Sequence, residues 1–345
     1  MRVFAFPYLS SAYTDGFYRA LRASGQEVIE GYFAGRWLLS NVRRGDVAHF
    51  HWPSFQYATR KGKLALIKGF VRFFVLMVLL RLLGARIVWT AHNLMPHDPS
   101  LFGWMDVLAR HIVIAFSYKI YVHSPSPSAT LAARFPAARK KIVTIPHGHF
   151  INFYPDSVTR DSARAHFDFN SPTFVYLFIG LCKPYKNLDG LVQAFRHMPG
   201  DTALLVAGKF QDQTYEAAVR DMSSADTRIR IDARFLPDDE LQLFLRACDA
   251  VVIPYREILT SGSAVLAMSF GRPVVTIDRG FLHDVVVEGS GILYDPDDPD
   301  DAGGLARALV AVTKQGWDET FIQAHISQFR YEDAAQIFLA SLKSV

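Results

Sequence analysis

The chain alternates strand-like and helix-like segments, and this alternation limits its possible folds more than any other feature. Short apolar runs rich in Val, Ile, Phe and Tyr are each followed by a longer segment with helical spacing of apolar residues. Such alternation is typical of a parallel sheet wrapped by helices. The series occurs twice, and a polar, proline-containing stretch at 151–172 interrupts it. The sequence therefore predicts an α/β protein with two Rossmann-like domains that face a central cleft.

The expected elements follow from the apolar spacing. Strands are predicted at 2–6, 27–31, 47–50, 86–90, 118–122, 142–145, 173–179, 203–207, 228–231, 250–253, 273–277 and 291–294. Helices are predicted at 16–23, 64–83, 102–115, 126–135, 188–197, 213–222, 238–247, 264–270 and 301–312. Ser126 fits the N-cap of its helix, with Pro127 at the first helical position.

Four parts are expected along the 345 residues. They are an N-terminal domain at 1–150, a linker at 151–172, a C-terminal domain at 173–325 and an amphipathic helix at 326–345 that packs back across the domains. In that helix Ala334, Ile337, Phe338 and Leu342 share one apolar face. Ligands of such sheets bind beyond the carboxyl ends of the strands, so we expect the functional residues there.

Charge and cysteine content exclude several classes of protein. The net charge of +4, from 37 basic and 33 acidic residues, is too small to indicate a nucleic-acid partner without a basic run. It does suit anionic small molecules or an anionic membrane surface. Cys182 and Cys248 are the only cysteines, which fits a reducing compartment and offers no metal-ligand spacing. With no secretory signal pattern at the start, we expect a cytoplasmic location.

The most apolar segment lies at 64–83. Its uncharged run, 73–80, is far shorter than the roughly 20 residues that span a bilayer. Basic residues punctuate the segment, namely Lys61, Lys63, Lys68, Arg72 and Arg81. Two interpretations stay open: a buried helix between two strands, or a helix whose basic edge also contacts anionic lipid.

The first strand of the second series ends in a basic motif. Gly180 allows a tight turn, and Lys183 and Lys186 precede a predicted helix N-terminus. A diphosphate requires positive charge together with N–H groups that have no other acceptor. Ser261, Gly262 and Ser263 open a later helix of the same sheet, where small residues let a phosphate approach the N-terminus. Because both motifs follow strand ends of one sheet, we predict a diphosphate site there.

A nucleoside site is expected beside these motifs. Gly208 ends the second strand of this series, where it allows close approach of a nucleotide or simply forms a turn. Phe235 and Leu236 offer an apolar surface for a base, and Glu257 is placed to accept hydrogen bonds from ribose hydroxyls.

Residues 173 to about 294 resemble the C-terminal domain of GT-B glycosyltransferases related to family 4. The ordered motifs are Phe-Ile-Gly…Lys…Tyr-Lys-Asn, Val-Ala-Gly, Leu-Pro-Asp-Asp-Glu-Leu, Val-Ile-Pro-Tyr and Ser-Gly-Ser…Gly-Arg-Pro-Val-Val. The resemblance implies a metal-independent hexosyltransferase without a cofactor, whose basic pair and small-residue loop hold the diphosphate of a sugar nucleotide. Retaining enzymes of family 4 usually carry two glutamates here, and this chain has Ile258 and Leu266 at the matching positions, with Glu257 one residue out of register.

Histidines follow the strands of the first half. Seven of the twelve lie at or near strand ends: His49, His51, His92, His97, His123, His147 and His149. The pairs lie on separate strands and no Cys or carboxylate completes a tetrahedral set, so a metal cluster is not expected. Imidazoles also suit proton transfer and hydrogen bonds to sugar hydroxyls or phosphate.

The histidine-containing motifs are similar to a narrower family, the bacterial exopolysaccharide β-mannosyltransferases. They read Asp-Val-Ala-His-Phe-His-Trp-Pro, Trp-Thr-Ala-His-Asn-Leu-Met-Pro-His-Asp and Pro-His-Gly-His-Phe. This resemblance implies an inverting transfer of mannose from GDP-mannose to a lipid-linked or oligosaccharide acceptor, with possible peripheral contact to the cytoplasmic face of the inner membrane. The missing glutamate pair agrees with inversion.

Inversion requires a base for the acceptor hydroxyl. The candidate bases are Asp15 and Asp98. Asp15 opens the first predicted helix, where it could also serve only as the N-cap. His92 is expected to orient substrate. His51, Trp52, Asn93 and His147 are the candidate acceptor-binding residues.

Other functions are weighed against this one. A retaining transferase that uses a UDP-sugar, a sugar-nucleotide epimerase of related architecture and a silent sugar-nucleotide-binding subunit stay open. A nicotinamide dehydrogenase is excluded because Gly-x-Gly-x-x-Gly is absent.

Overall fold

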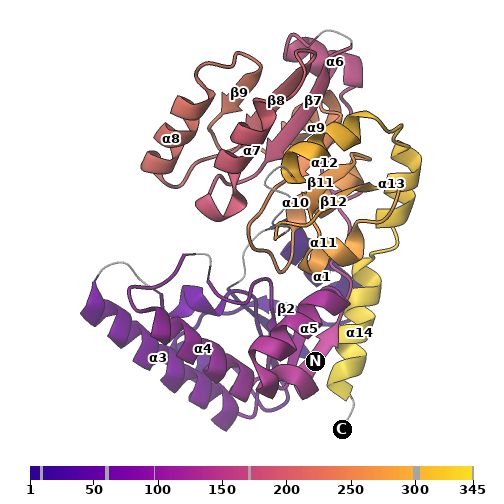
Figure 1. Cartoon of the computed structure of the whole chain (residues 1–345). Coiled ribbons are helices and arrows are strands. Elements are labelled where there is room, and N and C mark those ends of the chain that lie inside the picture. Colours follow the sequence, from indigo (N-terminus) through magenta and orange to yellow (C-terminus); the bar gives the residue numbers. More distant parts are fainter. Residues whose placement is uncertain (8–10, 59–61, 97, 170–171, 298–303, 344–345) are drawn as a thin grey trace. The chain divides into compact units, whose positions relative to one another are not determined.

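The computed structural model describes residues 1–7, 11–58, 62–96, 98–169, 172–297 and 304–343 (Figure 1). The chain divides into two compact units. The first comprises residues 1–148 and 329–345, and the second comprises residues 149–328. Each unit is built on its own six-stranded parallel sheet, so the predicted α/β class with two Rossmann-like domains is confirmed.

The sheet of the first unit has the strand order β2-β1-β3-β4-β5-β6. Its strands are β1 (Arg2–Phe6), β2 (Glu27–Glu30), β3 (Val47–Phe50), β4 (Arg86–Thr90), β5 (Lys119–Val122) and β6 (Ile142–Thr144). The second sheet has the order β12-β11-β10-β7-β8-β9. Its strands are β7 (Phe174–Ile179), β8 (Thr202–Ala207), β9 (Ile229–Asp232), β10 (Ala250–Ile253), β11 (Val274–Ile277) and β12 (Gly291–Tyr294). Each predicted strand is present to within one residue, because central parallel strands are buried on both faces and read as apolar runs.

The helices of the first unit are α1 (Ala12–Ala23), α2 (Gly35–Asn41), α3 (Lys63–Leu82), α4 (Gly103–Phe116), α5 (Pro125–Arg134) and α14 (Tyr331–Lys343). The prediction that α1 opens near Asp15 is wrong, because a capping box of Ser11 and Thr14 starts this helix earlier. The predicted cap of α5 is also wrong: Ser124 is its N-cap and Pro125 its first residue. Two consecutive Ser-Pro pairs satisfy the same pattern there. The short α2 was not predicted.

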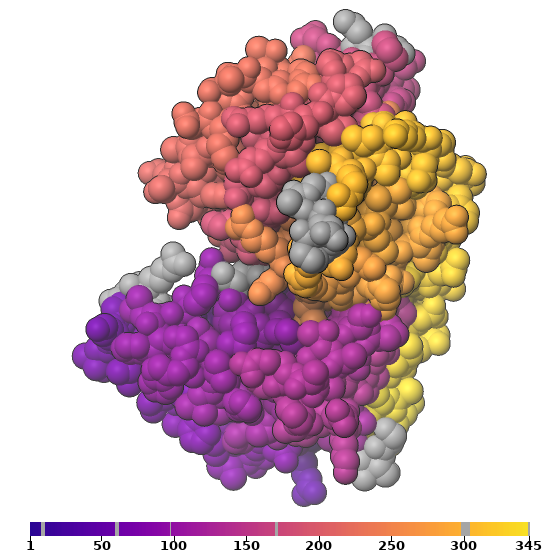
Figure 2. Space-filling view, in the orientation of Figure 1, coloured from indigo at the N-terminus to yellow at the C-terminus, as the bar shows by residue number. Residues whose placement is uncertain are grey.

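The C-terminal helix belongs to the first unit, where it packs against α1 and lies along the surface (Figures 1 and 2). Ala334, Phe338 and Leu342 are buried as predicted. Ile337 was expected on the same face and is instead 38% exposed, since it lies at the edge of the buried stripe. The ring of Tyr331 fits against Gly148, where an added Cβ would lie 2.2 Å from Tyr331 Cε1.

The helices of the second unit are α6 (Arg160–His166), α7 (Leu188–Phe195), α8 (Gln213–Ser223), α9 (Leu241–Ala247), α10 (Gly262–Ser269), α11 (Gly280–Val285), α12 (Gly304–Thr313) and α13 (Glu319–Ile326). The predicted linker, 151–172, contains α6, which packs against α9. Within this segment Arg164 forms an ion pair with Asp249. The short helices α11 and α13 were not predicted.

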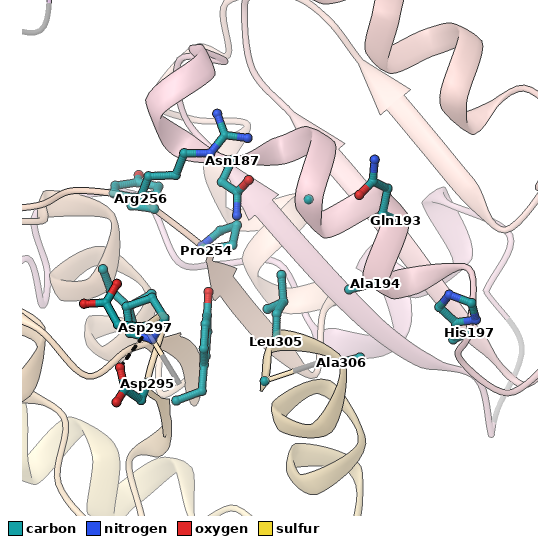
Figure 3. A pocket seen from close by; sticks show the side chains of 16 residues that line it. Asn187, Gln193, Ala194, His197, Pro254, Arg256, Asp295, Asp297, Leu305 and Ala306 are labelled. Carbon is teal, nitrogen blue, oxygen red and sulfur yellow. Dashed lines mark hydrogen bonds between the residues drawn. The ribbon is translucent and has the colours of Figure 1, made fainter. Parts of the chain in front are cut away.

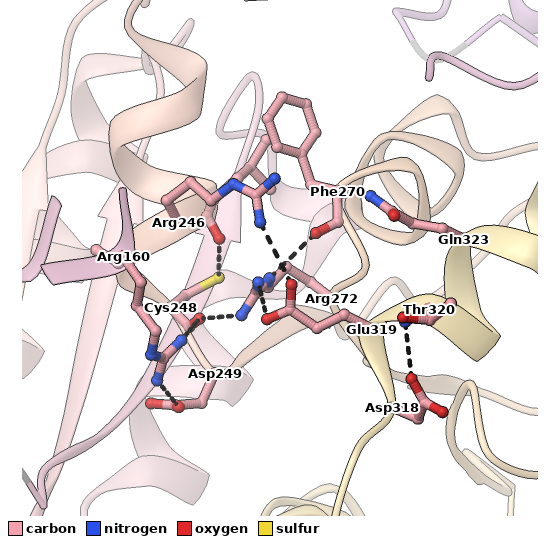
Figure 4. A network of polar contacts seen from close by, with 12 residues as sticks. Arg160, Arg246, Cys248, Asp249, Phe270, Arg272, Asp318, Glu319, Thr320 and Gln323 are labelled. Carbon is pink, nitrogen blue, oxygen red and sulfur yellow. Dashed lines mark hydrogen bonds and ion pairs between the residues drawn. The ribbon is translucent and has the colours of Figure 1, made fainter. Parts of the chain in front are cut away.

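A polar network holds α13 against the sheet of the second unit (Figure 4). The guanidinium of Arg272, whose side chain is 4% exposed, pairs with the carboxylate of Glu319 and donates to the carbonyls of Phe270 and Cys248. Arg246 also pairs with Glu319, at 3.3 Å. A buried guanidinium needs such partners, because an unpaired charge in the interior is costly.

Candidate donor-binding and histidine-rich sites

In the second unit the ammonium group of Lys186 lies at the carboxyl end of β7. Pro184–Lys186 form a 3-10 turn that positions this side chain. A Cβ added to Gly180 would lie 3.1 Å from Lys186 Nζ and 3.5 Å from Ser263 Oγ. The glycine, the lysine and the serine predicted from separate motifs therefore meet at one point.

Lys186 is buried, with 8% of its surface exposed, and within the described part of the chain it forms no ion pair. Its Nζ lies 5.0 Å from the centroid of the Tyr255 ring, a cation–π geometry. The Tyr255 hydroxyl in turn lies 3.5 Å from Ser263 Oγ. Buried lysines are rare unless they are paired, so this cation is suited to receive an anion.

The N-terminus of α10 supplies donors beside Lys186. Ser261 is its N-cap, and the side-chain oxygen accepts a hydrogen bond from the Ala264 N–H at 3.3 Å. No described residue accepts from the backbone N–H groups of Gly262 or Ser263. These two groups and the positive end of the helix can bind a phosphate oxygen.

The N-terminus of α7 does not offer the donors that the sequence suggested. The hydroxyl of Tyr215 accepts from the N–H groups of Leu188 and Asp189, at 3.1 and 3.3 Å. The expectation of unoccupied N–H groups after Lys186 is therefore wrong for α7. Lys183 lies half-buried at the start of the 3-10 turn.

Gly208 has a structural reason for being glycine. Its φ is +153°, and an added Cβ would lie 2.0 Å from the carbonyl oxygen of Gly180. Contact between the two backbones thus excludes a side chain whether or not a nucleotide binds nearby.

The remaining nucleoside candidates lie on loops of the second unit. Phe235 is 71% exposed and Leu236 is buried. The helix expected from Asp238 begins only at Leu241. Glu257 is exposed in the loop between β10 and α10. An exposed aromatic ring at a strand end is available for contact with a base, and the roles of Gly208, Phe235, Leu236 and Glu257 stay predictions.

A cavity of about 670 Å³ lies next to this loop (Figure 3). Asn187 and Arg256 line one side, and Asp295 and Asp297 line another. Arg256 also forms an ion pair with Asp189 at 2.6 Å. Residues 298–301 of the acidic run lie outside the described residues. No group of three or more His, Cys, Asp or Glu side chains in the described ranges has the geometry of a metal site.

In the first unit the histidines gather at the carboxyl ends of β3, β4, β5 and β6; His49 lies within β3, and the others follow the strand ends. His49, His51, His123 and His147 are almost fully buried, and His92 is half-buried. The ring centroid of Tyr13 lies 4.9–5.0 Å from those of His92, His123 and His147. The centroid of His123 lies 5.5 Å from that of His92 and 5.0 Å from that of His147. The strand ends therefore bring together histidines that are up to 98 positions apart in the sequence.

Burial keeps these imidazoles neutral. It lowers the pKa of His49 to about 3 and that of His147 to about 4. Burial first, and then the neighbouring imidazoles, hold the pKa values of His51, His92 and His123 well below the ordinary value.

The predicted role of His51 is corrected by its contacts. Its Nε2 lies 2.6 Å from the Tyr18 hydroxyl and its Nδ1 lies 3.0 Å from His92 Nε2. Both ring nitrogens of the buried His51 thus form hydrogen bonds within the protein, so neither is available to bind an acceptor substrate. Trp52 stacks on the His92 ring at 4.7 Å. Asn93 is half-buried.

The two candidate bases differ in their surroundings. Asp15 is half-buried in the first turn of α1, where Ser11 rather than Asp15 is the N-cap. Asp98 is exposed in the segment after β4. Its predicted neighbour His97 lies outside the described residues.

Sequence reasoning missed the tyrosines that complete both sites. Tyr255 lies beneath Lys186, and Tyr18 links His49 to His51. Tyr13 lies with its ring centroid 4.9 Å from that of His92. A tyrosine after a strand or in an amphipathic helix looks like an ordinary core residue in the sequence, so its polar end carried no signal.

Known proteins match both the sequence and the fold. Residues 173–315 match the family model described as Glycosyl transferases group 1. A GDP-mannose:glycolipid 4-beta-D-mannosyltransferase of Xanthomonas campestris pv. campestris is 27% identical over 246 residues, which cover 68% of this chain and 62% of the relative. A D-inositol 3-phosphate glycosyltransferase of Xylanimonas cellulosilytica is 27% identical over 239 residues, which cover 62% of this chain and 57% of the relative. The chain thus matches less than two thirds of the length of these relatives.

Solved structures show the same two-sheet architecture. HepE of Anabaena, in complex with UDP and glucose, has a TM-score of 0.73 at 17% identity, with 100% of this chain and 99% of that chain covered. Sucrose-phosphate synthase of Thermosynechococcus elongatus has a TM-score of 0.71 at 17% identity, with 98% and 99% covered. The resemblance stated from the sequence is confirmed: the chain has the GT-B fold, and its residues 173–315 match the glycosyl transferases group 1 model.

Proposed function

We propose that this chain transfers a hexose from a sugar nucleotide to a lipid-linked or oligosaccharide acceptor in bacterial polysaccharide synthesis, with inversion and without a metal ion. GDP-mannose is the favoured donor, because the relative described above, which is 27% identical to this chain, is named a GDP-mannose:glycolipid mannosyltransferase. The second unit binds the donor and the first unit binds the acceptor.

The observation that carries the proposal is the buried ammonium group of Lys186, which forms no ion pair with any residue in the described ranges. It lies beside Ser263 and the N-terminus of α10, so that one cation and two N–H groups converge. A diphosphate leaving group gains negative charge as the glycosidic bond breaks, and such donors stabilise that charge without an ion. Lys183 adds a second cation near the same turn.

The first unit supplies the rest of the reaction. Asp15 or Asp98 takes the proton of the acceptor hydroxyl as the hydroxyl oxygen attacks the anomeric carbon. The absence of a glutamate pair, with Ile258 and Leu266 in its place, supports inversion over retention. Neutral imidazoles at the edge of this sheet are suited to hydrogen-bond sugar hydroxyls.

A donor screen followed by product analysis tests the proposal. We expect GDP-mannose to raise the melting temperature more than UDP-sugars do, because a ligand bound only by the native state stabilises it. With a bacterial glycolipid extract and EDTA present, we expect GDP release and a β-linked mannosyl product by NMR. Transfer that stops with EDTA would refute metal independence, and an α-linked product would refute inversion. Turnover of a sugar nucleotide without acceptor would refute the transfer reaction.

We further propose that the α3–α4 surface contacts an anionic membrane. Leu64, Val71 and Val75 of α3 are 65%, 54% and 54% exposed, and Trp104 of α4 is 63% exposed. The sequence of α3 contains no acidic residue and carries Lys63, Lys68, Arg72 and Arg81. No helix among the described residues is long and apolar enough to span a bilayer. Apolar side chains edged by cations suit the interface of an anionic bilayer.

A further inference from the structure

Four buried side chains of the first unit connect to His92 through an unbroken series of hydrogen bonds, which we call the imidazole chain. Its links, in order, are Thr90 Oγ1 to His49 Nε2 at 2.8 Å, His49 Nδ1 to the Tyr18 hydroxyl at 3.1 Å, that hydroxyl to His51 Nε2 at 2.6 Å, and His51 Nδ1 to His92 Nε2 at 3.0 Å. Every member except His92 has 0% of its surface exposed.

The outer end of the imidazole chain is the Nδ1 atom of His92. This ring is half-buried, and within the described residues its Nδ1 has no hydrogen-bond partner. Trp52 stacks on one side of the ring, and Tyr13 packs edge-on at 4.9 Å. These contacts fix the ring plane, so Nδ1 has a defined direction.

Two directions of donation satisfy all four links, and the distances favour one of them. Bonds from O–H donors to oxygen are shorter, near 2.7–2.8 Å, than bonds from N–H donors to oxygen, about 2.9–3.0 Å, and we apply the same order to the imidazole links. The two short links therefore have the hydroxyls of Thr90 and Tyr18 as donors, at 2.8 and 2.6 Å. The two longer links have imidazole N–H donors.

This order determines the tautomer of each ring. His49 accepts at Nε2, so its hydrogen is on Nδ1, from which it donates to Tyr18. His51 accepts at Nε2 and donates from Nδ1 to His92 Nε2. A neutral His92 that accepts at Nε2 must carry its own hydrogen on Nδ1.

We propose that the imidazole chain holds His92 as the neutral Nδ1–H tautomer, which donates a hydrogen bond to an oxygen atom of a bound substrate. The other members are positioning residues. The identity of that substrate, a sugar nucleotide or a glycan acceptor, rests on the proposed function, whereas the tautomer does not. In this state His92 has no basic lone pair at its exposed edge, so it is a donor and the base is a carboxylate.

The surroundings favour a neutral ring. Burial, and then the neighbouring imidazoles of His51 and His147, hold the pKa of His92 well below its ordinary value. A neutral donor binds a hydroxyl, a phosphate or a glycosidic oxygen without the cost of a buried charge.

The tautomer is measured directly by NMR of the ¹⁵N-labelled full chain at pH 7, from the chemical shifts and couplings of the imidazole nitrogens. The signal of His92 is identified by its loss in His92→Gln. We expect the hydrogen of His92 on Nδ1. In Tyr18→Phe, which removes the central hydroxyl, we expect loss of the pure Nδ1–H pattern.

Tyr121→Phe is the matched control. Tyr121 is also buried in the first unit and its hydroxyl bonds Ser341 Oγ at 2.8 Å, outside the imidazole chain. We expect an unchanged His92 pattern in this variant. If Tyr18→Phe does not fold, Thr90→Val cuts the chain at its inner end and should also disturb the pattern. An Nε2–H tautomer in the wild type, or the same pattern in all folded variants, would overturn the proposal even if transfer activity were confirmed.

Discussion

The ammonium group of Lys186 lies 5.0 Å from the centre of the Tyr255 ring. Lys186 is the buried cation of the candidate donor site, and it has no carboxylate partner among the described residues. Tyr255 directly follows Pro254 at the end of β10, whereas Lys186 follows β7. Two neighbouring parallel strands therefore hold the cation and the aromatic ring that supports it.

Removal of the ring is expected to weaken donor binding. A cation–π contact contributes about 0.5–2 kcal/mol, so Tyr255→Leu should weaken GDP binding roughly two- to thirtyfold. Tyr255→Phe keeps the ring and should bind within about twofold of the wild type. Isothermal titration calorimetry provides both values, and equal affinity of all three proteins would show that the ring does not support the cation.

The network of α13 predicts a stability difference between two glutamates. Glu319→Ala leaves the buried Arg272 guanidinium without its carboxylate, which we expect to cost about 2 kcal/mol, below the full cost for a buried pair since Glu319 is 45% exposed. Glu332→Ala removes an exposed pair with Arg330 at 3.5 Å and should cost less than about 0.5 kcal/mol. Urea unfolding of both variants measures the difference. Similar losses would mean that the buried guanidinium does not depend on Glu319.

The histidine cluster predicts that the first unit loses stability in mild acid. The pKa of His49 is about 3 and that of His147 about 4 in the folded state, below the unfolded value of about 6.5. The unfolded chain therefore binds more protons below pH 6.5, and the free energy of unfolding falls by about 1.4 kcal/mol per pH unit for each such histidine. The contribution of these histidines to the free energy of unfolding is fully present above pH 6.5 and is lost as the pH falls towards 4.

Urea unfolding between pH 7.5 and 5.0 measures this slope. Tryptophan fluorescence suits the measurement because four of the five tryptophans, Trp37, Trp52, Trp89 and Trp104, belong to the first unit. His49→Gln should reduce the slope by about 1.4 kcal/mol per pH unit. The exposed His283 of the second unit, whose pKa Asp278 raises, acts in the opposite direction. A flat profile in the wild type would contradict the buried neutral state.

The α3 surface predicts binding to anionic vesicles. Replacement of Val71 and Val75 by Asp removes two exposed apolar side chains and adds two negative charges among the cations of α3. We expect at least a tenfold loss of sedimentation with vesicles that contain phosphatidylglycerol, and no binding of either protein to pure phosphatidylcholine. Val287→Asp, an exposed apolar residue of the second unit, is the control. Equal binding of wild type and the double variant would exclude this surface.

The sequence predicted the sheets well because their inner strands, such as β3 and β10, are buried apolar runs with clear ends. It placed helix starts less well, since Ser124-Pro125 and Ser126-Pro127 repeat one capping pattern and only the fold selects the first. The convergence of Gly180, Lys186 and Ser263 followed from the rule that parallel strands end at one edge. The link from His49 through Tyr18 to His51 could not be predicted, because it depends on how the side chains of α1 and β3 point.

The role of Lys186 as the ligand of the donor diphosphate is tested most directly by calorimetric titration of GDP into the wild type, Lys186→Ala and Lys314→Ala. Lys314 is an exposed lysine of the same unit and serves as the control. We expect Lys186→Ala to lose roughly ten- to a hundredfold in affinity, the equivalent of one charge-assisted hydrogen bond, and Lys314→Ala to bind like the wild type. Unchanged affinity in Lys186→Ala would place the diphosphate elsewhere and contradict the proposed donor site.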